Sequence, residues 1–138
     1  MATITFAARG VRNVFQDTVR LRQWLIDVAR DHAVAINEIT FVIMDDEALL
    51  TFNKRYLGHD NYTDVITFAG EPGVGLSGDV LMSYPRIREN AQTFHVSVQL
   101  ELRRVMVHGI LHLLGHVDKT ERKRAAMRAQ EDKYLSRF

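Results

Sequence analysis

The chain has 138 residues, of which 46% are hydrophobic and 25% are charged, and its formal net charge is +1 at pH 7. This composition is typical of a folded globular protein and argues against a disordered, fibrous or membrane-embedded chain. The sequence contains no cysteine, which excludes disulfides, thiolate metal sites and cysteine nucleophiles. A near-neutral charge excludes a strongly basic nucleic-acid-binding coat but leaves room for local basic patches.

The organisation of the sequence predicts a single domain over residues 1–138. There is no internal repeat or low-complexity tract, and the only prolines are Pro72 and Pro85. No apolar stretch is long enough to cross a bilayer, and residues 1–9 are too short and too interrupted for a signal peptide. We therefore expect a cytoplasmic protein without a membrane partner.

The first half of the chain is predicted to alternate strands and helices. A short strand is expected at residues 3–6. A helix follows, because apolar side chains recur at helical spacing up to Asp31: Val19, Trp24, Leu25, Val28 and Ala29. Residues 39–44 form a β-branched and aromatic run that predicts a strand. The next helix begins at the acidic residues 45–47, which we interpret as capping residues rather than as a cation site.

The second half is predicted to contain two strands followed by three helices. The strands are expected at residues 65–68 and 80–83, around a glycine-rich loop at 69–78. A helix begins near Pro85, a long apolar helix covers residues 98–115, and a charged amphipathic helix covers residues 120–137. These elements together predict an α+β protein.

The long helix carries the clearest chemical signal. At about 100° per residue its apolar side chains cover nearly every direction, which is typical of a buried helix. The exception is a narrow polar stripe formed by Glu101, Arg104, His108 and His112. Buried imidazoles cost free energy unless they are bound, and a divalent metal binds two histidines that lie four residues apart on one helix face.

The residues after this helix supply a third ligand. Gly115 is expected to adopt the left-handed conformation that ends the helix and reverses the chain. The reversal brings Asp118 within reach of the same cation. Two imidazoles and one carboxylate leave a fourth coordination position open, as in catalytic sites. We therefore predict that His108, His112 and Asp118 bind one divalent metal ion, with His116 as the alternative third ligand.

Two other interpretations of this segment stay open. The histidines could be hydrogen-bonded core residues, with Gly115 an ordinary helix cap and Asp118 a surface acid. The site could also belong to a metallopeptidase, but such enzymes have a glutamate general base directly after the first histidine. Here that position is Gly109, and Glu101 lies two turns away on the same stripe. The residues therefore assign no general base.

Three ordered motifs carry a resemblance to a known family. The long helix and its end match the pattern H-G-x-L-H-L-x-G at His108, Gly109, Leu111, His112, Leu113 and Gly115, with His116 next. Upstream, the pattern N-x-x-Y-x-G-x-D-x-x-T-D-V-x-x-F is matched by Asn53, Tyr56, Gly58, Asp60, Thr63, Asp64, Val65 and Phe68. Gly78, Asp79 and Val80 match a G-D-hydrophobic strand. Over residues 37–118 the chain resembles the YbeY family, the metal-dependent endoribonucleases known as rRNA maturation factors.

The resemblance implies a fold and an activity. The fold would be a mixed four-stranded sheet packed with about five helices, including a zincin-like metal-binding helix beside an open cleft. The activity would be single-strand-specific cleavage of RNA in the maturation of small-subunit rRNA. The implied cofactor is one divalent metal ion, with zinc expected and no nucleotide cofactor. The implied partners are rRNA and components of the small ribosomal subunit.

Two positions depart from the family pattern. Most members have histidine at the third-ligand position, where this chain has Asp118. A carboxylate there lowers the net charge of the site and predicts a weaker Lewis acid than three imidazoles would give. Members usually carry an arginine directly after the tyrosine that aligns with Tyr56, whereas this chain has Leu57. Arg55 is the nearest candidate for that catalytic role.

Several other patterns in the sequence have an ordinary structural explanation beside a functional one. Residues 73–78 match G-x-G-x-x-G, but a strand follows them, so they predict a strand connection and not a dinucleotide site. The arginines at 86, 88, 122, 124 and 128 could hold RNA phosphates or form a solvated face, and both readings stay open. His32, His59 and His95 stand alone and are expected in turns or at the surface.

Three functions remain in competition. The leading one is a metal-dependent endoribonuclease in rRNA maturation and ribosome biogenesis. The second is a metallopeptidase-like hydrolase, and the third is a non-catalytic ribosome-assembly module in which the metal only holds the fold.

Overall fold

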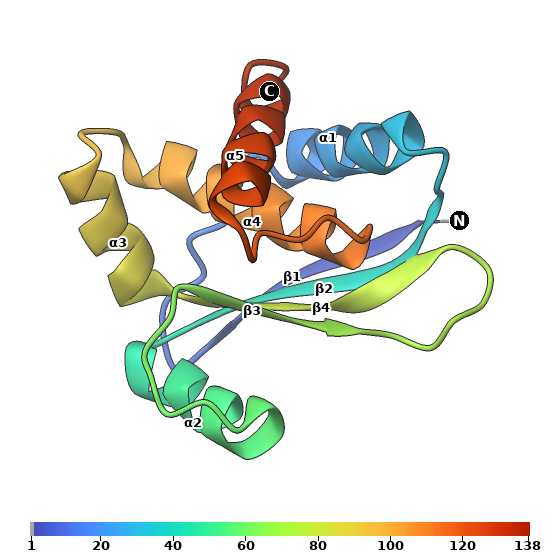
Figure 1. Ribbon diagram of the computed structural model, residues 1–138. Coiled ribbons are helices and arrows are strands. Elements are labelled where there is room, and N and C mark those ends of the chain that lie inside the picture. The colour runs from blue at the N-terminus through green and yellow to red at the C-terminus, as the bar shows by residue number, and fades with distance from the viewer. Residues whose placement is uncertain (1) are drawn as a thin grey trace.

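The computed structural model describes residues 2–138 of the chain. Four strands and five helices follow one another in the order shown in Figure 1: β1 (Thr3–Arg9), α1 (Thr18–Asp31), β2 (Ile36–Met44), α2 (Asp46–Leu57), β3 (Val65–Ala69), β4 (Leu76–Ser83), α3 (Tyr84–Thr93), α4 (Val98–Leu113) and α5 (Glu121–Leu135). Among residues 2–138, no helix combines the length and the apolar character needed to cross a bilayer.

The strands form one mixed sheet in the order β1-β2-β4-β3. β1 pairs with β2 and β2 pairs with β4 in parallel, whereas β3 and β4 form an antiparallel hairpin. The parallel pairing of β1 and β2 requires a crossover, which α1 supplies. The α+β fold with a mixed four-stranded sheet and five helices is therefore confirmed.

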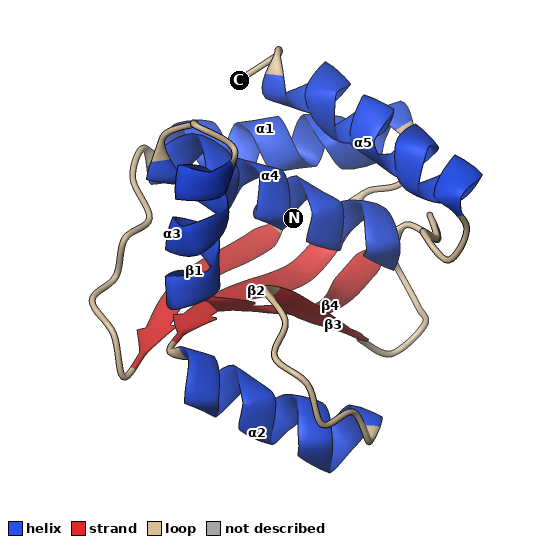
Figure 2. Cartoon of the chain, turned by 60° about the vertical axis from the view of Figure 1, so that its left-hand side comes forward, coloured by secondary structure: helices blue, strands red, loops and turns tan. Residues whose placement is uncertain are grey.

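Helices cover both faces of the sheet unequally. α1, α3, α4 and α5 lie on one face and α2 lies alone on the other, as Figures 1 and 2 show. The larger core cluster lies between the sheet and the four helices and includes Phe41, Val80, Met106 and Ile110, while the smaller one, on the α2 side, is formed by Met44, Leu49, Ile66 and Leu81. Removal of this apolar surface from water is the main favourable contribution to folding.

Helix α4 occupies the centre of the four-helix layer. It contacts α1, α3, α5, β3 and β4. Its apolar residues are buried on several sides, as the sequence predicts for a helix with little solvent exposure. Gly109 allows the close approach to the sheet, since a Cβ atom at this position would lie 2.7 Å from Cγ1 of Val80.

Four of the five helices begin at a capping side chain. The caps are Asp45, Ser83, Ser97 and Thr120, and each accepts a hydrogen bond from the main-chain N–H three residues later. Such a cap satisfies one of the free N–H groups of the first turn. The capping role predicted for the acidic residues 45–47 is confirmed at Asp45.

The boundaries of several elements differ from the sequence-based expectation, among them β1, β4 and α4. β1 continues to Arg9 because it stays paired with β2 as far as Met44. β4 begins at Leu76, within the predicted glycine-rich loop, because Leu76 pairs with Ile36 of β2 and its main-chain N–H donates to the carbonyl of Ala35. α4 ends at Leu113, two residues before Gly115. The second half of the G-x-G-x-x-G segment, residues 76–78, therefore belongs to β4.

Candidate metal centre

Three side chains converge at the C-terminal end of α4. His108 and His112 lie one helical turn apart, and Asp118 lies in the loop between α4 and α5. One ligand atom from each lies within 4.8 Å of the others. Oδ2 of Asp118 is 3.6 Å from Nε2 of His108 and 3.4 Å from Nε2 of His112. The structure therefore brings together the three residues that the sequence selected.

The loop that carries Asp118 is folded by the end of α4. Gly115 has a φ of 101°, the left-handed conformation expected from the sequence. Its N–H donates to the carbonyl of His112 at 3.0 Å, and the N–H of His116 donates to the carbonyl of Leu111 at 3.0 Å. These bonds reverse the chain and direct the following residues back over the helix, so that Asp118 faces the two imidazoles.

Helix α5 supplies a carboxylate that orients the first histidine. Oε2 of Glu131 lies 2.6 Å from Nδ1 of His108, and the Glu131 side chain is buried. With Nδ1 donating to this carboxylate, the lone pair of His108 is on Nε2, the atom that faces Asp118. Burial opposes protonation of His108, but the hydrogen bond and the charge of Glu131 outweigh it and raise the histidine pKa. The surroundings of the His108 ring therefore favour a positive charge.

Arg104 keeps Glu131 in place. Its Nη1 donates to Oε1 of Glu131 at 3.0 Å, and its Nη2 donates to Oδ1 of Asp132 at 2.7 Å. Both contacts are charge-assisted hydrogen bonds, which are stronger than neutral ones. The polar stripe of α4 is therefore bound to α5 through two carboxylates. Nothing local in the sequence identified Glu131, which lies in a helix of many alternating charges.

His116 points away from the three converging side chains. Its Nε2 lies 2.9 Å from Nε2 of His32, at the end of α1, and Nδ1 of His32 lies 2.8 Å from the carbonyl oxygen of Val28. Burial, together with the nearby His32 and His112, lowers the pKa of His116. Asp118 and not His116 therefore completes the group. His32, expected to stand alone, instead has a partly buried histidine partner.

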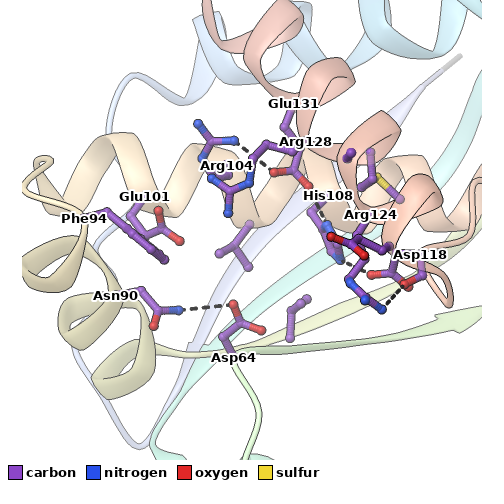
Figure 3. Close-up of a pocket in the computed structure, with 15 residues that line it drawn as sticks. Asp64, Asn90, Phe94, Glu101, Arg104, His108, Asp118, Arg124, Arg128 and Glu131 are labelled. Atoms are coloured by element: carbon purple, nitrogen blue, oxygen red, sulfur yellow. Dashed lines mark hydrogen bonds and ion pairs between the residues drawn. The ribbon is translucent and has the colours of Figure 1, made fainter.

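A cavity of about 610 Å³ extends from these residues along the polar stripe of α4. Figure 3 shows His108, Asp118 and Arg124 at one end and Phe94, Asn90 and Glu101 at the other. Its walls come from α3, α4, α5 and the start of β3. The stripe predicted to face a cleft lines this cavity at Glu101, Arg104 and His108.

Basic residues reach the cavity from α4 and α5, and those of α5 carry no carboxylate partner among residues 2–138. Arg124 and Arg128 line it, and Arg124 donates through Nη1 to the main-chain carbonyl of Asp118 at 3.5 Å. Arg86 lies elsewhere, since its Nε donates to both oxygens of Asp46. Of the arginines considered in the sequence, two are thus placed where a phosphate could meet them.

Arg55 and Gly109 lie away from the cavity. Arg55 is on α2, across the sheet from α4, and its guanidinium lies over the ring of Tyr56. Gly109 faces Val80 of β4, so a side chain at this position would enter the sheet. Neither residue is placed to act at the three converging side chains.

The donor set fits a divalent metal ion. Two imidazole nitrogens and one carboxylate are the ligands of many catalytic sites, and the Glu131 carboxylate behind His108 is the usual support for a ligating histidine. The ligand atoms already lie close enough together to share one cation.

Comparison with known proteins decides the family. The family model described as "Endoribonuclease YbeY" matches residues 3–138. The chain belongs to the YbeY family. The resemblance inferred from residues 37–118 is therefore confirmed and extends over almost the whole sequence.

Curated YbeY relatives cover nearly the full chain. A protein named Endoribonuclease YbeY from Cytophaga hutchinsonii is 39% identical over 135 residues, which are 97% of this chain and 94% of the relative. The protein of the same name from Porphyromonas gingivalis is 40% identical over 138 residues, 98% of this chain and 89% of the relative. The solution structure of a Thermotoga maritima protein is similar with a TM-score of 0.66 and 22% identity, covering 99% of this chain and 87% of that chain, and supports the fold.

Proposed function

We propose that this member of the YbeY family is a metal-dependent endoribonuclease that cleaves single-stranded RNA during maturation of small-subunit rRNA. The observation that carries the proposal is the convergence of His108, His112 and Asp118 at one end of a cavity whose wall contains two arginines, Arg124 and Arg128, that form no ion pair with a carboxylate among residues 2–138. Family membership supports the nuclease activity.

His108 and His112 would hold the ion through Nε2, and Asp118 through a carboxylate oxygen. Zinc is the proposed metal because it accepts nitrogen and oxygen ligands in this number and leaves a position open. When bound, a divalent ion supplies Lewis acidity toward a phosphodiester oxygen. Glu131 keeps the His108 ring in the orientation that presents Nε2.

Arg124 and Arg128 would bind the RNA backbone. Each lines the cavity, and within residues 2–138 neither forms an ion pair with a carboxylate. Arginine donates several N–H groups in a plane and matches phosphate oxygens well. Binding at these residues would place a phosphodiester beside the three metal-binding side chains and would balance its negative charge.

The proposal extends to the setting of the reaction. The partners would be rRNA and components of the small ribosomal subunit, in the cytoplasm. This part follows from the family likeness and not from a contact seen in the chain.

The metallopeptidase alternative lacks a base. A glutamate in the place of Gly109 would have to act from a position that faces Val80 and the sheet. The assembly-module alternative differs only in the role of the metal, so metal removal separates it from an enzyme.

The test combines chelation with two readouts. Purified protein is treated with a chelator, and cleavage of a fluorescent single-stranded RNA is measured beside the circular dichroism spectrum. We expect cleavage to be lost and to return with added zinc, while the spectrum stays unchanged. Unfolding on chelation would support a structural metal, as would RNA binding without metal-dependent cleavage. Hydrolysis of peptides that depends on His112 would support a peptidase.

A further inference from the structure

The end of the cavity remote from the metal ligands has a different chemistry. Phe94, Asn90 and Glu101 line it, with Asp64 beneath them, and Figure 3 shows these side chains grouped away from Asp118. Glu101 and His108 lie on the same stripe of α4, two turns or about 10 Å apart. This separation is comparable to the length of one nucleotide measured from its phosphate to the far edge of its base.

Glu101 is a buried acid without a partner. Its exposed fraction is 4%, yet among residues 2–138 no hydrogen bond or ion pair involves its side chain, because Arg104 donates to α5 instead. Among the same residues, Nε of Arg103 is the one fully buried side-chain polar atom that lacks a hydrogen-bond partner, so the unpaired Glu101 oxygens are not fully buried. The Glu101 oxygens therefore keep contact with the cavity and are free to accept hydrogen bonds from a ligand.

Asn90 and Asp64 lie beside Glu101 at this end of the cavity. Nδ2 of Asn90 donates to Oδ2 of Asp64 at 3.3 Å, so this amide is paired with Asp64 and not with Glu101. A ligand recognised here would have to present N–H groups. A lone buried acceptor without such a donor is costly, so an unpartnered carboxylate aimed into a cavity points to a ligand that completes it.

Phe94 offers a flat surface beside these acceptors. It follows the last turn of α3, half of its side chain is exposed, and the guanidinium carbon of Arg128 lies 5.7 Å from the centre of its ring. Unpaired RNA bases are commonly bound by stacking on an aromatic ring while hydrogen bonds read their edge. The Phe94 ring could provide the stacking surface, and the Glu101 carboxylate beside it could provide the hydrogen bonds.

We propose that Phe94 and Glu101 form a binding site for an unpaired guanine base, with Phe94 stacking on the base and the Glu101 carboxylate accepting hydrogen bonds from its Watson–Crick edge. Guanine is the base that presents two adjacent N–H donors, N1–H and N2–H, to the two oxygens of one carboxylate. Uracil has a single N–H on that edge, and hypoxanthine lacks the amino group.

The position relative to the metal ligands gives the site a role in specificity. This step rests on the proposed function: a phosphodiester held near Asp118 and Arg124 would have an adjacent base within reach of Glu101. Cleavage would then occur preferentially beside an unpaired guanine. The hydrogen bonds from the base would favour the ionised carboxylate, whose burial otherwise disfavours it.

Mononucleotides test the inference without any cleavage, because they contain no internucleotide bond. Binding of GMP, IMP and UMP to the metal-loaded protein is measured by NMR titration. We expect GMP to bind about tenfold more tightly than IMP or UMP, as is typical of a two-point contact to a base edge. The largest shifts are expected at the Phe94 ring and the Asn90 amide. Equal affinities for GMP and UMP would overturn the inference.

Two variants and a control sharpen the result. Glu101→Gln keeps the size of the side chain and should abolish the preference for GMP, while Phe94→Ala should weaken GMP and UMP to a similar extent. Glu89→Gln, on the exposed side of α3, is the matched control and should keep the preference. A GMP preference that survives in Glu101→Gln would refute the assignment.

The outcome is separable from that of the proposed function. RNA cleavage without any preference for GMP would leave the nuclease intact and remove the guanine site. A GMP preference in a protein that cleaves no RNA would keep the binding site and remove the nuclease.

Discussion

Glu131 accepts a hydrogen bond from Nδ1 of His108 over 2.6 Å, so a residue of α5 fixes the ring of the first of the two α4 histidines proposed to bind the metal. The contact is buried and is supported by Arg104. Glu131 is not one of the three proposed ligands, so substituting it tests the metal centre and leaves every ligand unchanged.

Glu131→Gln should weaken metal binding. The amide keeps the shape of the side chain but loses the negative charge that orients His108 and favours a cation beside it. We expect the metal dissociation constant to rise about 10- to 100-fold, the usual effect of losing such a partner. Competition with a chromophoric chelator measures it. Asp132→Asn is the control, since it removes the other Arg104 contact and leaves the His108 contact intact; equal losses in both variants would contradict the role of Glu131.

His112→Ala should abolish metal retention. The substitution removes one of the three atoms that converge near Asp118. Elemental analysis of the purified variant beside the wild-type protein measures the change, and His59→Ala, an exposed position directly after α2, should retain the wild-type content. If His112→Ala carried as much metal as the wild type, the ligand assignment would be wrong.

Glu101 should make stability depend on pH. Burial raises the pKa of this carboxyl from 4.5 to about 7 in the folded protein. Between these values the folded state binds more protons than the unfolded state, so the free energy of unfolding falls as pH rises, by up to about 3 kcal/mol. Glu101→Gln has no proton to lose.

Urea unfolding of the metal-free proteins at pH 5 and pH 8 measures this difference. Relative to the wild type, Glu101→Gln should be more stable at pH 8 than at pH 5. A difference between the two proteins that does not change with pH would show that the carboxyl titrates normally.

Gly109→Ala should destabilise the fold. Its Cβ atom would lie 2.7 Å from Cγ1 and 3.1 Å from Cγ2 of Val80, so α4 would have to move away from β4. Overpacking of this kind costs about 1–3 kcal/mol. Urea unfolding measures it, and Gly73→Ala is the control, because a Cβ atom there meets no other atom within 4 Å. Equal stability of the two variants would argue against the close packing of α4 on the sheet.

Local patterns in the sequence were enough to predict the core of the candidate site. The spacing of His108 and His112 determines that both lie on one face of a helix, and Gly115 determines that the chain reverses after it. The strand and helix types followed from periodicity for the same reason, since each depends on neighbours within one element.

Contacts between distant elements could not be predicted in this way. Glu131 meets His108, and His32 meets His116, only after α1 and α5 pack around α4. The early start of β4 likewise depends on pairing with β2, a strand that lies far away in the sequence. Arg55 looked near Tyr56 in sequence, but the sheet separates α2 from the cavity.

The order of elements along the chain has a consequence for synthesis. α4 with both histidines is translated before α5 with Glu131. A nascent polypeptide therefore displays its imidazoles before it has the carboxylate that aligns one of them. Full nuclease activity would have to await the docking of α5. An incomplete chain on the ribosome would therefore not yet cleave RNA efficiently.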